Sequence, residues 1–253
     1  MLESLGFNFD GIHSSQLGIL NVYVDAGLFQ EVFLPTRTIN EVVIRGRSTP
    51  YPQGVTYAPL EFPVKIAFED GYDSQKIREV ARWLCKDYYA PLTFDSNPER
   101  VFYGMFVNDS SLTHNGVQQG YVTLAVRCNS PFSYSHFKDS DDFHIDGEEI
   151  IEIHNDGDLP IKPEIDIYKI GRGSLTINNF STRDNPFEFD ILEDQETIYV
   201  DNEEEVIETD ISNTERYDNF NDNYLTLERG VNRLIITGSC IVRFRYQFVF
   251  LQG

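Results

Sequence analysis

Strict alternation of apolar and polar residues limits what this chain can fold into more than any other feature. Between residues 60 and 68 an apolar side chain occupies every second position, which places all of them on one face of a β-strand. The alternating sets are Leu60, Phe62, Val64, Ile66 and Phe68; Val122, Leu124, Val126 and Cys128; and Val242, Phe244, Tyr246, Phe248 and Phe250. The pattern predicts a mainly β protein whose sheets bury one face.

One segment has the period of an amphipathic helix instead. Asp73 or Ser74 can cap its N-terminus, and Pro91 ends the segment. The apolar stripe, spaced i, i+3, i+4 and i+7, consists of Ile77, Val80, Ala81 and Leu84. The basic side chains that lie mostly off this stripe form either a solvated face or a face that binds a partner; they are Lys76, Arg78, Arg82 and Lys86.

Charge divides the chain into two parts. Residues 1–133 carry 10 basic and 14 acidic side chains, whereas residues 134–253 carry 10 and 27. The polar stretch 133–142 lacks a clean period, as is usual for a linker. We therefore predict a β-rich N-terminal domain with one helix and a long loop over residues 1–133, and a C-terminal domain over residues 134–253.

The second domain is predicted to be an antiparallel β-sandwich. Short strand-like segments alternate with turn signals at regular spacing, and no useful helical stripe interrupts them. The turn signals are Asn155–Asp158, Gly171–Gly173, Thr182–Pro186, Arg229–Gly230 and Gly238–Ser239. The acidic run at residues 203–205 is interpreted as a solvated loop.

The segment from Arg45 to Tyr57 is predicted to be the long loop of the first domain. It contains two prolines and two glycines and is longer than most connections between strands. Tyr and Arg bury large areas at modest entropic cost, which favours a subunit contact through Arg45, Arg47, Tyr51, Gln53 and Tyr57. An ordinary exposed loop is the alternative.

The charge of the chain bears on its partners. With 41 acidic and 20 basic side chains, the formal net charge is −21. Affinity for nucleic acid comes mainly from Lys and Arg on phosphates, so this charge argues against a protein that grips duplex DNA. No run approaches the roughly 20 apolar residues of a membrane-spanning helix, and the first residues lack a secretory signal pattern. We expect synthesis in a cytosol and no membrane insertion.

The sequence holds no recognisable catalytic, nucleotide-binding or metal-binding motif. The patterns G-x-S-x-G, G-x-x-x-x-G-K-[ST] and H-E-x-x-H are absent, and residues 142–147 imitate only the start of a calcium loop. The separations of His136, His144 and His154 match no common zinc site. We therefore expect no cofactor, no metal and no enzymatic activity.

The three cysteines are widely spaced and include no C-x-x-C pair. They are Cys85, Cys128 and Cys240. We expect all three to be reduced, buried thiols.

A series of short motifs follows a definite order along nearly the whole chain. In the first half they are Val42–Arg47, Tyr57–Val64, Trp83–Leu84, Leu92–Phe94, Asn97–Pro98, Val101–Tyr103 and the strand reaching Cys128 and Pro131–Phe132. In the second half they are Ile153–Pro160, Pro163–Ile167 and Gly230–Leu234, followed by the last strand. The order and spacing of these motifs resemble those of the distal tail proteins of long, flexible-tailed bacteriophages. The size is similar to that of the short form in siphophages of Gram-positive hosts such as Bacillus.

The resemblance implies a homohexameric ring at the tail tip, present in isolation as one ring or as two rings back to back. The N-terminal domain would build the ring, and the galectin-like C-terminal sandwich would project outward. One face would meet the tail tube protein and the other the tail-associated lysin or fibre protein. DNA would pass through the channel without specific binding. The chain would then be a structural hub located in the virion and synthesised in the host cytoplasm.

Two other functions remain open. A carbohydrate-binding module for host cell-wall glycan would use exposed aromatic residues of the second domain. The candidates are Tyr199, Tyr217 and Tyr224. The alternative is that these side chains occupy core or rim positions of the domain. An acidic glycoside hydrolase is the third hypothesis. Its carboxylate pair is defined by separation in space, so the sequence does not locate it.

Overall fold

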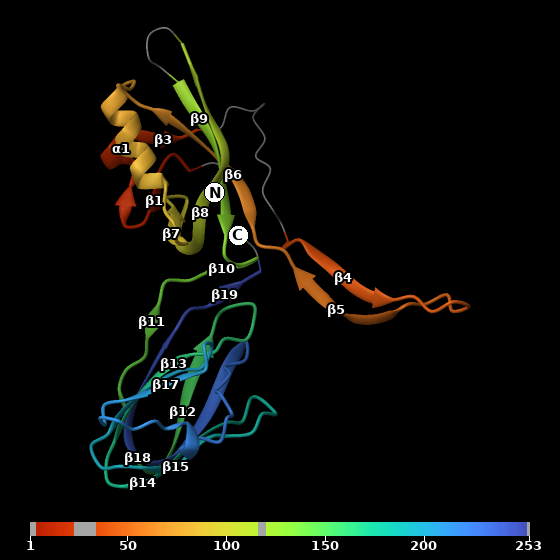
Figure 1. Cartoon of the computed structure of the whole chain (residues 1–253). Coiled ribbons are helices and arrows are strands. Elements are labelled where there is room, and N and C mark those ends of the chain that lie inside the picture. Colours follow the sequence, from red (N-terminus) through yellow and green to blue (C-terminus); the bar gives the residue numbers. More distant parts are fainter. Residues whose placement is uncertain (1–3, 23–33, 116–119, 252–253) are drawn as a thin grey trace. The chain divides into compact units, whose positions relative to one another are not determined.

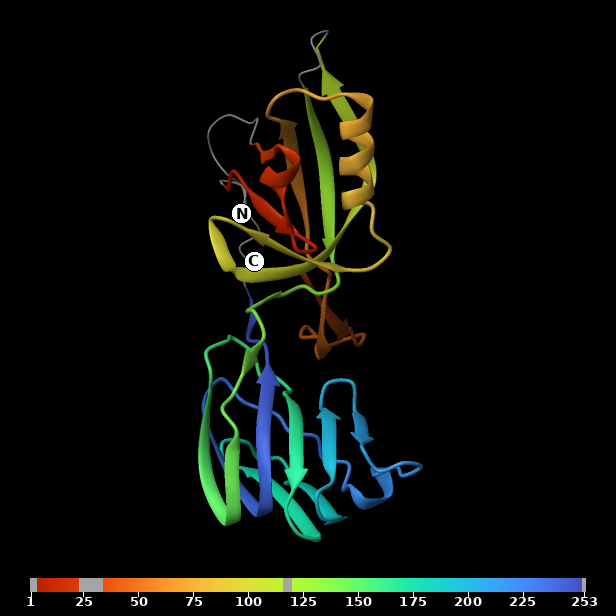
Figure 2. The ribbon, with the colours of Figure 1, turned by 90° about the vertical axis from the view of Figure 1, so that its left-hand side faces the viewer.

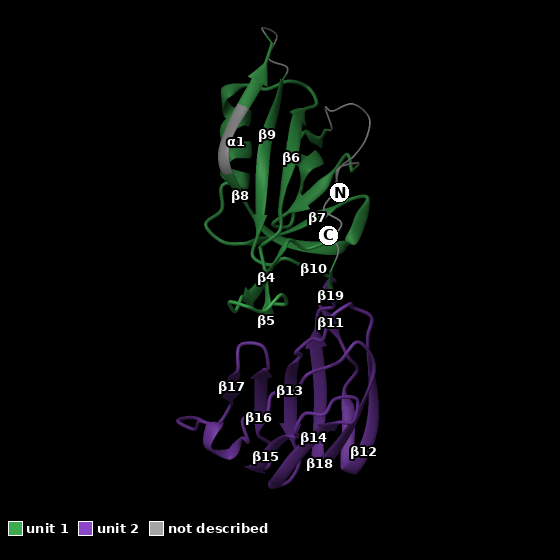
Figure 3. Ribbon diagram, turned by 90° about the vertical axis from the view of Figure 1, so that its right-hand side faces the viewer, with its two compact units in different colours: residues 1–134, 250–253 green, residues 135–249 purple. Residues whose placement is uncertain are grey.

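The chain forms two compact units built mainly of antiparallel strands (Figure 3). The computed structural model describes residues 4–22, 34–115 and 120–251. Unit 1 comprises residues 1–134 and 250–253, and unit 2 comprises residues 135–249. The predicted mainly β fold class is confirmed.

The end of the chain returns to unit 1. Phe250 belongs to that unit, and the guanidinium carbon of Arg100 lies 3.4 Å from the centre of its ring, a cation–π contact. The predicted second domain, residues 134–253, included this segment, because the alternation that begins at residue 242 continues to residue 250. In the structure that run is divided between β18, which ends at Tyr246, and the short β19 (Val249–Phe250).

Unit 1 contains a nine-stranded antiparallel sheet with one α-helix beside it (Figure 2). The strand order is β2-β1-β7-β8-β9-β6-β3, with β10 paired to β8 and β19 paired to β10. The strands are β1 (Phe7–Phe9), β2 (Ile12–His13), β3 (Ile19–Asn21), β6 (Glu61–Phe68), β7 (Ala90–Phe94), β8 (Asn97–His114), β9 (Gly120–Cys128) and β10 (Ser133–Tyr134), and a 3-10 helix η1 (Ser14–Leu17) follows β2. Apart from Leu60, which precedes β6, the first two alternating sets lie in β6 and β9, which are neighbours in the sheet.

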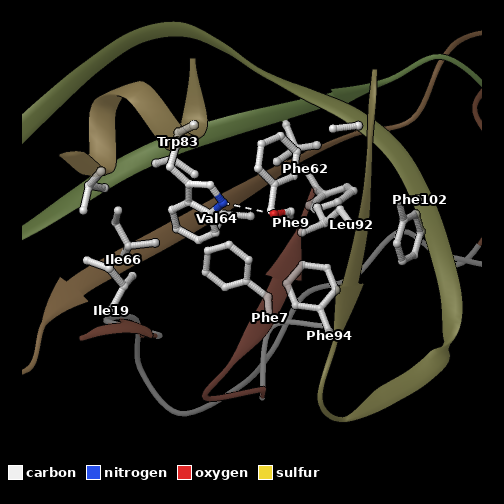
Figure 4. Packing of buried hydrophobic residues seen from close by; sticks show 14 of the residues in the cluster. Phe7, Phe9, Ile19, Phe62, Val64, Ile66, Trp83, Leu92, Phe94 and Phe102 are labelled. Atoms are coloured by element: carbon white, nitrogen blue, oxygen red, sulfur yellow. Dashed lines mark hydrogen bonds between the residues drawn. The ribbon is translucent and has the colours of Figure 1, made fainter. Parts of the chain in front are cut away.

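The predicted helix is α1 (Ser74–Leu84). The carboxylate of Asp73 accepts a hydrogen bond of 2.7 Å from the backbone N–H of Lys76, which satisfies one free donor of the first turn. The indole Nε1 of Trp83 donates to the carbonyl oxygen of Phe9 over 3.0 Å (Figure 4), so the helix is tied to β1. Among the described residues, no helix is long and apolar enough to cross a membrane.

The core beneath α1 is aromatic. The rings of Phe7 and Trp83 stack with centroids 5.5 Å apart, and Phe9 meets Trp83 edge-on at 6.1 Å. Phe62 and Phe94 lie next to them (Figure 4). Tilted and edge-on aromatic pairs of this kind stabilise a core beyond the area they bury.

The predicted long loop from Arg45 to Tyr57 is wrong in its second half. Residues 51–57 form β5 (Tyr51–Tyr57), which pairs antiparallel with β4 (Arg37–Val42), and only residues 43–50 connect them. These strands form a separate two-stranded sheet (Figure 1). Among the described residues neither strand has a second partner strand, and a missing N–H is tolerated at a sheet edge, so Pro52 does not interrupt β5.

Unit 2 contains an eight-stranded antiparallel sheet. The strand order is β15-β14-β18-β13-β16-β17, and β11 and β12 pair with the other edge of β18. The elements are β11 (Lys138–Asp139), β12 (Phe143–Asn155), β13 (Glu164–Lys169), β14 (Gly173–Asn179), β15 (Phe187–Leu192), β16 (Thr197–Asp201), β17 (Val206–Thr209), the 3-10 helix η2 (Tyr217–Asn219) and β18 (Gly230–Tyr246). β18 organises the unit, because four other strands pair with it.

The turn predicted at Gly238–Ser239 is wrong, because both residues lie inside the 17-residue strand β18. Along one edge β18 pairs with β14 up to Thr237 and with β13 from Cys240 onward. Gly238 has a φ of +136°, and a Cβ there would lie 2.9 Å from the carbonyl oxygen of Ser174. Glycine at this position permits a close backbone approach where the strand changes partner.

Candidate assembly and binding surfaces

The structure brings the predicted contact residues of unit 1 together on one hairpin, formed by β4, β5 and their connection. Tyr51, Gln53 and Tyr57 lie on β5, and Arg45 and Arg47 lie in the connection. All five are exposed. The guanidinium carbon of Arg47 lies 3.8 Å from the centre of the Tyr51 ring, so a cation–π contact orders the tip side of the hairpin.

No residue of β4 or β5 is buried, although the hairpin is rich in large apolar side chains. They are Ile39, Val42, Val43, Ile44, Tyr51, Val55 and Tyr57, with exposures from 38% to 73%. An isolated two-stranded hairpin is at best marginally stable in water, and contiguous exposed apolar groups are typical of protein interfaces. The hairpin therefore has the properties of a segment that another chain covers.

Tyr217 and Tyr224, the predicted glycan contacts, lie against the same part of unit 2. The Tyr217 hydroxyl accepts a hydrogen bond of 3.1 Å from the backbone N–H of Ile207. The Tyr224 hydroxyl donates one of 3.1 Å to the carbonyl oxygen of Glu205. Burial raises the pKa of Tyr224, whereas Tyr217 is 42% exposed. The two rings are thus fixed beside β17, and Tyr217 is the more accessible.

Tyr199, the third aromatic candidate, lies on β16 directly across from Asp166 of β13. Burial and the adjacent carboxylate of Glu164 raise the pKa of Tyr199 to about 12. Asp166 in turn pairs with Arg243 at 2.8 Å. Tyr199 therefore belongs to a network of polar side chains that runs across β18, β13 and β16.

Sequence reasoning missed a buried ion pair that supports the segment carrying Tyr217. The Arg216 Nε and Nη2 atoms donate to the two carboxylate oxygens of Glu196 over 2.7 and 2.8 Å. The side chains are 8% and 0% exposed. Thr209 also donates to Glu196, over 2.6 Å. Burial acts to raise the pKa of Glu196, but these hydrogen bonds outweigh it and hold that pKa below its usual value.

Cys85 departs from the prediction of three buried thiols. Cys128 and Cys240 are 1% and 0% exposed, and burial raises their pKa values to about 12 and about 11, which makes both unreactive at neutral pH. Cys85 is exposed, because it follows the last helical residue of α1 as its C-cap. All three thiols are free.

The candidate metal ligands are not assembled into a site. Within the described part of the chain, no group of three or more His, Cys, Asp or Glu side chains is placed to hold a metal ion. Most of the calcium-loop imitation, residues 142–147, lies in β12. His144 also lies on β12, and His154 pairs with Asp156.

A chain of hydrogen bonds in unit 1 joins a serine, a histidine and an aspartate. His13 Nδ1 lies 2.7 Å from the Ser15 hydroxyl and also accepts from the Ser15 backbone N–H. His13 Nε2 lies 3.0 Å from Asp95. The histidine caps η1 and links it to the end of β7, and a Cβ at Gly6 would collide with the Asp95 carboxylate. The arrangement therefore has a structural role in joining these segments.

Comparison with known families covers both units. The family profile described as phage tail protein N-terminal domain matches residues 2–130, and that described as phage tail C-terminal domain matches residues 126–246. The chain belongs to this family of phage tail proteins. It is a structural protein of a phage tail, and its location is the tail of the virion.

This phage tail protein has a relative of nearly equal length. It is 36% identical over 250 residues to the SPbeta prophage-derived uncharacterized protein YomH of Bacillus subtilis (strain 168), with 98% of this chain and 99% of the relative covered. Such coverage extends the relationship to both units.

Its fold is similar to that of solved phage hub and baseplate proteins. The Dit protein (gp 19.1) of phage SPP1, described as a paradigm of hub adsorption apparatus in Gram-positive infecting phages, matches with a TM-score of 0.71 at 16% identity, over 96% of this chain and 98% of that one. A chain of the phage P2 baseplate in its activated conformation with Sr matches with a TM-score of 0.51 at 10% identity, over 95% and 97%. The predicted resemblance to distal tail proteins is confirmed.

Proposed function

We propose that this tail protein forms a homohexameric ring at the distal tip of a long, non-contractile tail. The ring joins the tail tube protein on one side to the tail-associated lysin or fibre protein on the other, and DNA passes through its channel. The observation that carries this proposal is the fold likeness to the SPP1 hub over nearly the full length of both chains. In isolation the ring is single or paired back to back.

The exposed hairpin supports assembly from identical subunits. Its two strands have no partner strand in the described part of the chain beyond each other, and its apolar side chains face water. A segment of one copy that binds a different surface on the next copy makes a heterologous contact, and such contacts close into rings when the rotation allows. Arg45, Arg47, Tyr51, Gln53 and Tyr57 are the proposed subunit contacts.

The charge of the chain supports passage of DNA without a specific grip. Six copies carry six times the formal charge of −21, and a strongly anionic wall repels phosphates instead of binding them. The assembly is proposed to be purely structural, without enzymatic activity, and to be made in the host cytoplasm before incorporation into the virion.

Imaging of the purified protein tests the proposal. Negative-stain micrographs should contain six-fold rings with an open centre. A variant that lacks residues 48–54, which are the end of the hairpin connection and the first part of β5, should remain folded by circular dichroism yet form no rings. A wild-type protein that stays monomeric at high concentration would contradict the ring, and unchanged rings in the deletion variant would remove the hairpin from the interface.

Glycan binding is a second candidate function, favoured by the exposed, hydrogen-bonded ring of Tyr217 next to Tyr224. A fixed aromatic ring with a polar edge can contact both the apolar face and the hydroxyls of a sugar. Pull-down with purified host cell wall tests it. Binding that disappears in the Tyr217→Ala, Tyr224→Ala double variant supports this function, and no binding by the wild type retires it.

A further inference from the structure

The hairpin of β4 and β5 buries no side chain within its own chain. The two strands contain six and seven residues, and every one of these residues is exposed. The strand that follows, β6, buries four apolar side chains in the core of unit 1, namely Phe62, Val64, Ile66 and Phe68. A lone two-stranded hairpin without a buried face has at best marginal stability in water. The hairpin therefore lacks the burial that stabilises the nine-stranded sheet.

The side-chain interactions within the hairpin are local and exposed to water. The amide of Asn40 donates a hydrogen bond of 2.7 Å to the Thr56 hydroxyl, and the Arg47 guanidinium lies over the Tyr51 ring. The register of the two strands is also irregular between Asn40 and Glu41. Exposed contacts of these kinds contribute little, because water competes for the same groups. The paired strands therefore gain little stability from their own side chains.

The composition of β5 and the length of the connection weaken the hairpin further. Pro52 and Gly54 both lie in β5, and both residue types are depleted in strands. Glycine also loses more backbone freedom than other residues when it becomes ordered. The connection spans residues 43–50, whereas most hairpin loops have about two to five residues. Neither strand propensity nor a tight turn thus replaces the missing burial.

The base of the hairpin is attached to unit 1 independently of the paired strands. The backbone N–H of Ala58 donates a hydrogen bond of 2.9 Å to the carbonyl oxygen of Thr36. The rings of Tyr57 and Phe132 lie 5.5 Å apart. A segment with few buried contacts can open while the rest of its domain stays folded. The strands beyond this base can therefore separate without unfolding of unit 1.

We propose that the hairpin becomes stably ordered only when a neighbouring copy covers it in the ring. In a single copy its strands separate and pair again, and burial of its apolar side chains by the neighbour keeps them paired. This inference rests on the proposed ring and describes the hairpin before and after assembly. A segment that orders on binding loses conformational entropy at that step, so it binds less tightly than its contact area suggests. Contacts between two free copies are then weak, and a closed ring is favoured because it alone covers every hairpin.

Hydrogen exchange followed by mass spectrometry tests the proposal on the full-length protein. Rings are compared with single copies obtained by dilution, and light scattering confirms the mass of each sample. If dilution does not dissociate the rings, the Val43→Asp, Ile44→Asp variant supplies single copies, because charges on these exposed apolar positions oppose their burial. Both changes lie outside the two strands. In single copies the amides of β4 and β5 should exchange within about tenfold of the rate of an unstructured peptide. In rings they should exchange at least about 100-fold more slowly, while β6 is protected in both samples.

The possible results separate the proposal from the ring on which it rests. Exchange of β4 and β5 in single copies that is as slow as that of β6 would overturn the proposal, because the hairpin would then be stable alone. Fast exchange in intact rings, or rings formed by the Val43→Asp, Ile44→Asp variant, would also overturn it, because the hairpin would then not be covered. These results leave the ring itself intact. Absence of rings at every concentration would contradict the proposed function instead.

A disulfide between the two strands gives an independent test. Thr38 and Thr56 are register partners, so cysteines at these positions are close enough to form a disulfide. The Thr38→Cys, Thr56→Cys variant is made together with Cys85→Ser, which removes the exposed native thiol. Because the disulfide fixes the hairpin before assembly, the oxidised form should assemble at about tenfold lower concentration than the same protein after reduction. The Thr38→Ser, Thr56→Ser variant controls for the lost side chains and should not respond to reductant. Equal or weaker assembly by the oxidised form would overturn the proposal.

Discussion

Loss of the buried ion pair should destabilise unit 2 far more than loss of an exposed one. Arg216→Met leaves Glu196, whose side chain is 0% exposed, as a buried charge without its cation. Breaking such a pair costs about 3–5 kcal/mol. Unit 2 spans residues 135–249, and for a domain of this size each kcal/mol lowers the melting temperature by roughly 4 °C. The expected shift for unit 2 is therefore about 12–20 °C.

Thermal unfolding followed by circular dichroism and by fluorescence measures this shift. Trp83 is the single tryptophan of the chain, and it lies in unit 1, so its fluorescence follows unit 1 while circular dichroism follows both units. The matched control is Arg233→Met, whose ion pair with Glu152 has side chains 69% and 58% exposed and contributes little. Similar small shifts in both variants would refute the role assigned to Glu196 and Arg216.

Three other changes have defined outcomes. The pKa of Glu196 is lowered in the folded chain. The stabilising effect of its carboxylate is therefore complete above the unfolded-state pKa of about 4.3 and is lost as the pH falls through the folded-state pKa. Urea unfolding of unit 2 should show this loss of stability in the wild type and less of it in Glu196→Gln. Asp73→Ala removes the α1 cap and should lower the stability of unit 1 by about 1 kcal/mol, measured by Trp83 fluorescence in urea. Gly238→Ala should destabilise unit 2 by about 1–3 kcal/mol through strain at positive φ, whereas Gly173→Ala, with nothing within 4 Å of the added Cβ, should be nearly neutral in the same assay.

The helices and strands that could be predicted from the sequence are those that bury one face, because burial of one face makes apolar residues recur at a regular spacing. The set from Phe62 to Phe68 lies in β6, and the helical stripe lies in α1 with Asp73 as its cap. The second strand of the hairpin, β5, was predicted as part of a loop because it buries no face in the chain itself. Without burial there is no selection for alternation, and Pro52 suggested irregular structure although a two-stranded ribbon tolerates it.

The remaining features depend on contacts between distant residues. Glu196 and Arg216 are two of many charged residues in unit 2, and no local pattern indicates that they meet away from water. Cys85 has the spacing of a residue on the apolar stripe of α1, which predicted that its thiol is buried. The sheet does not extend over it, and this follows only from the arrangement of α1 against β8 and β9. Gly238 resembled a turn glycine because the change of strand partner within β18 leaves no mark in composition.

The mass of the purified protein in solution tests the central claim most directly. The chain has a mass of 29.2 kDa, so a hexamer has a mass of about 175 kDa and a pair of rings about 350 kDa. Sedimentation equilibrium or light scattering over a wide concentration range should give one of these two values. A single species at 29.2 kDa at the highest concentration reached would contradict the account of this chain as the subunit of a closed tail-tip ring.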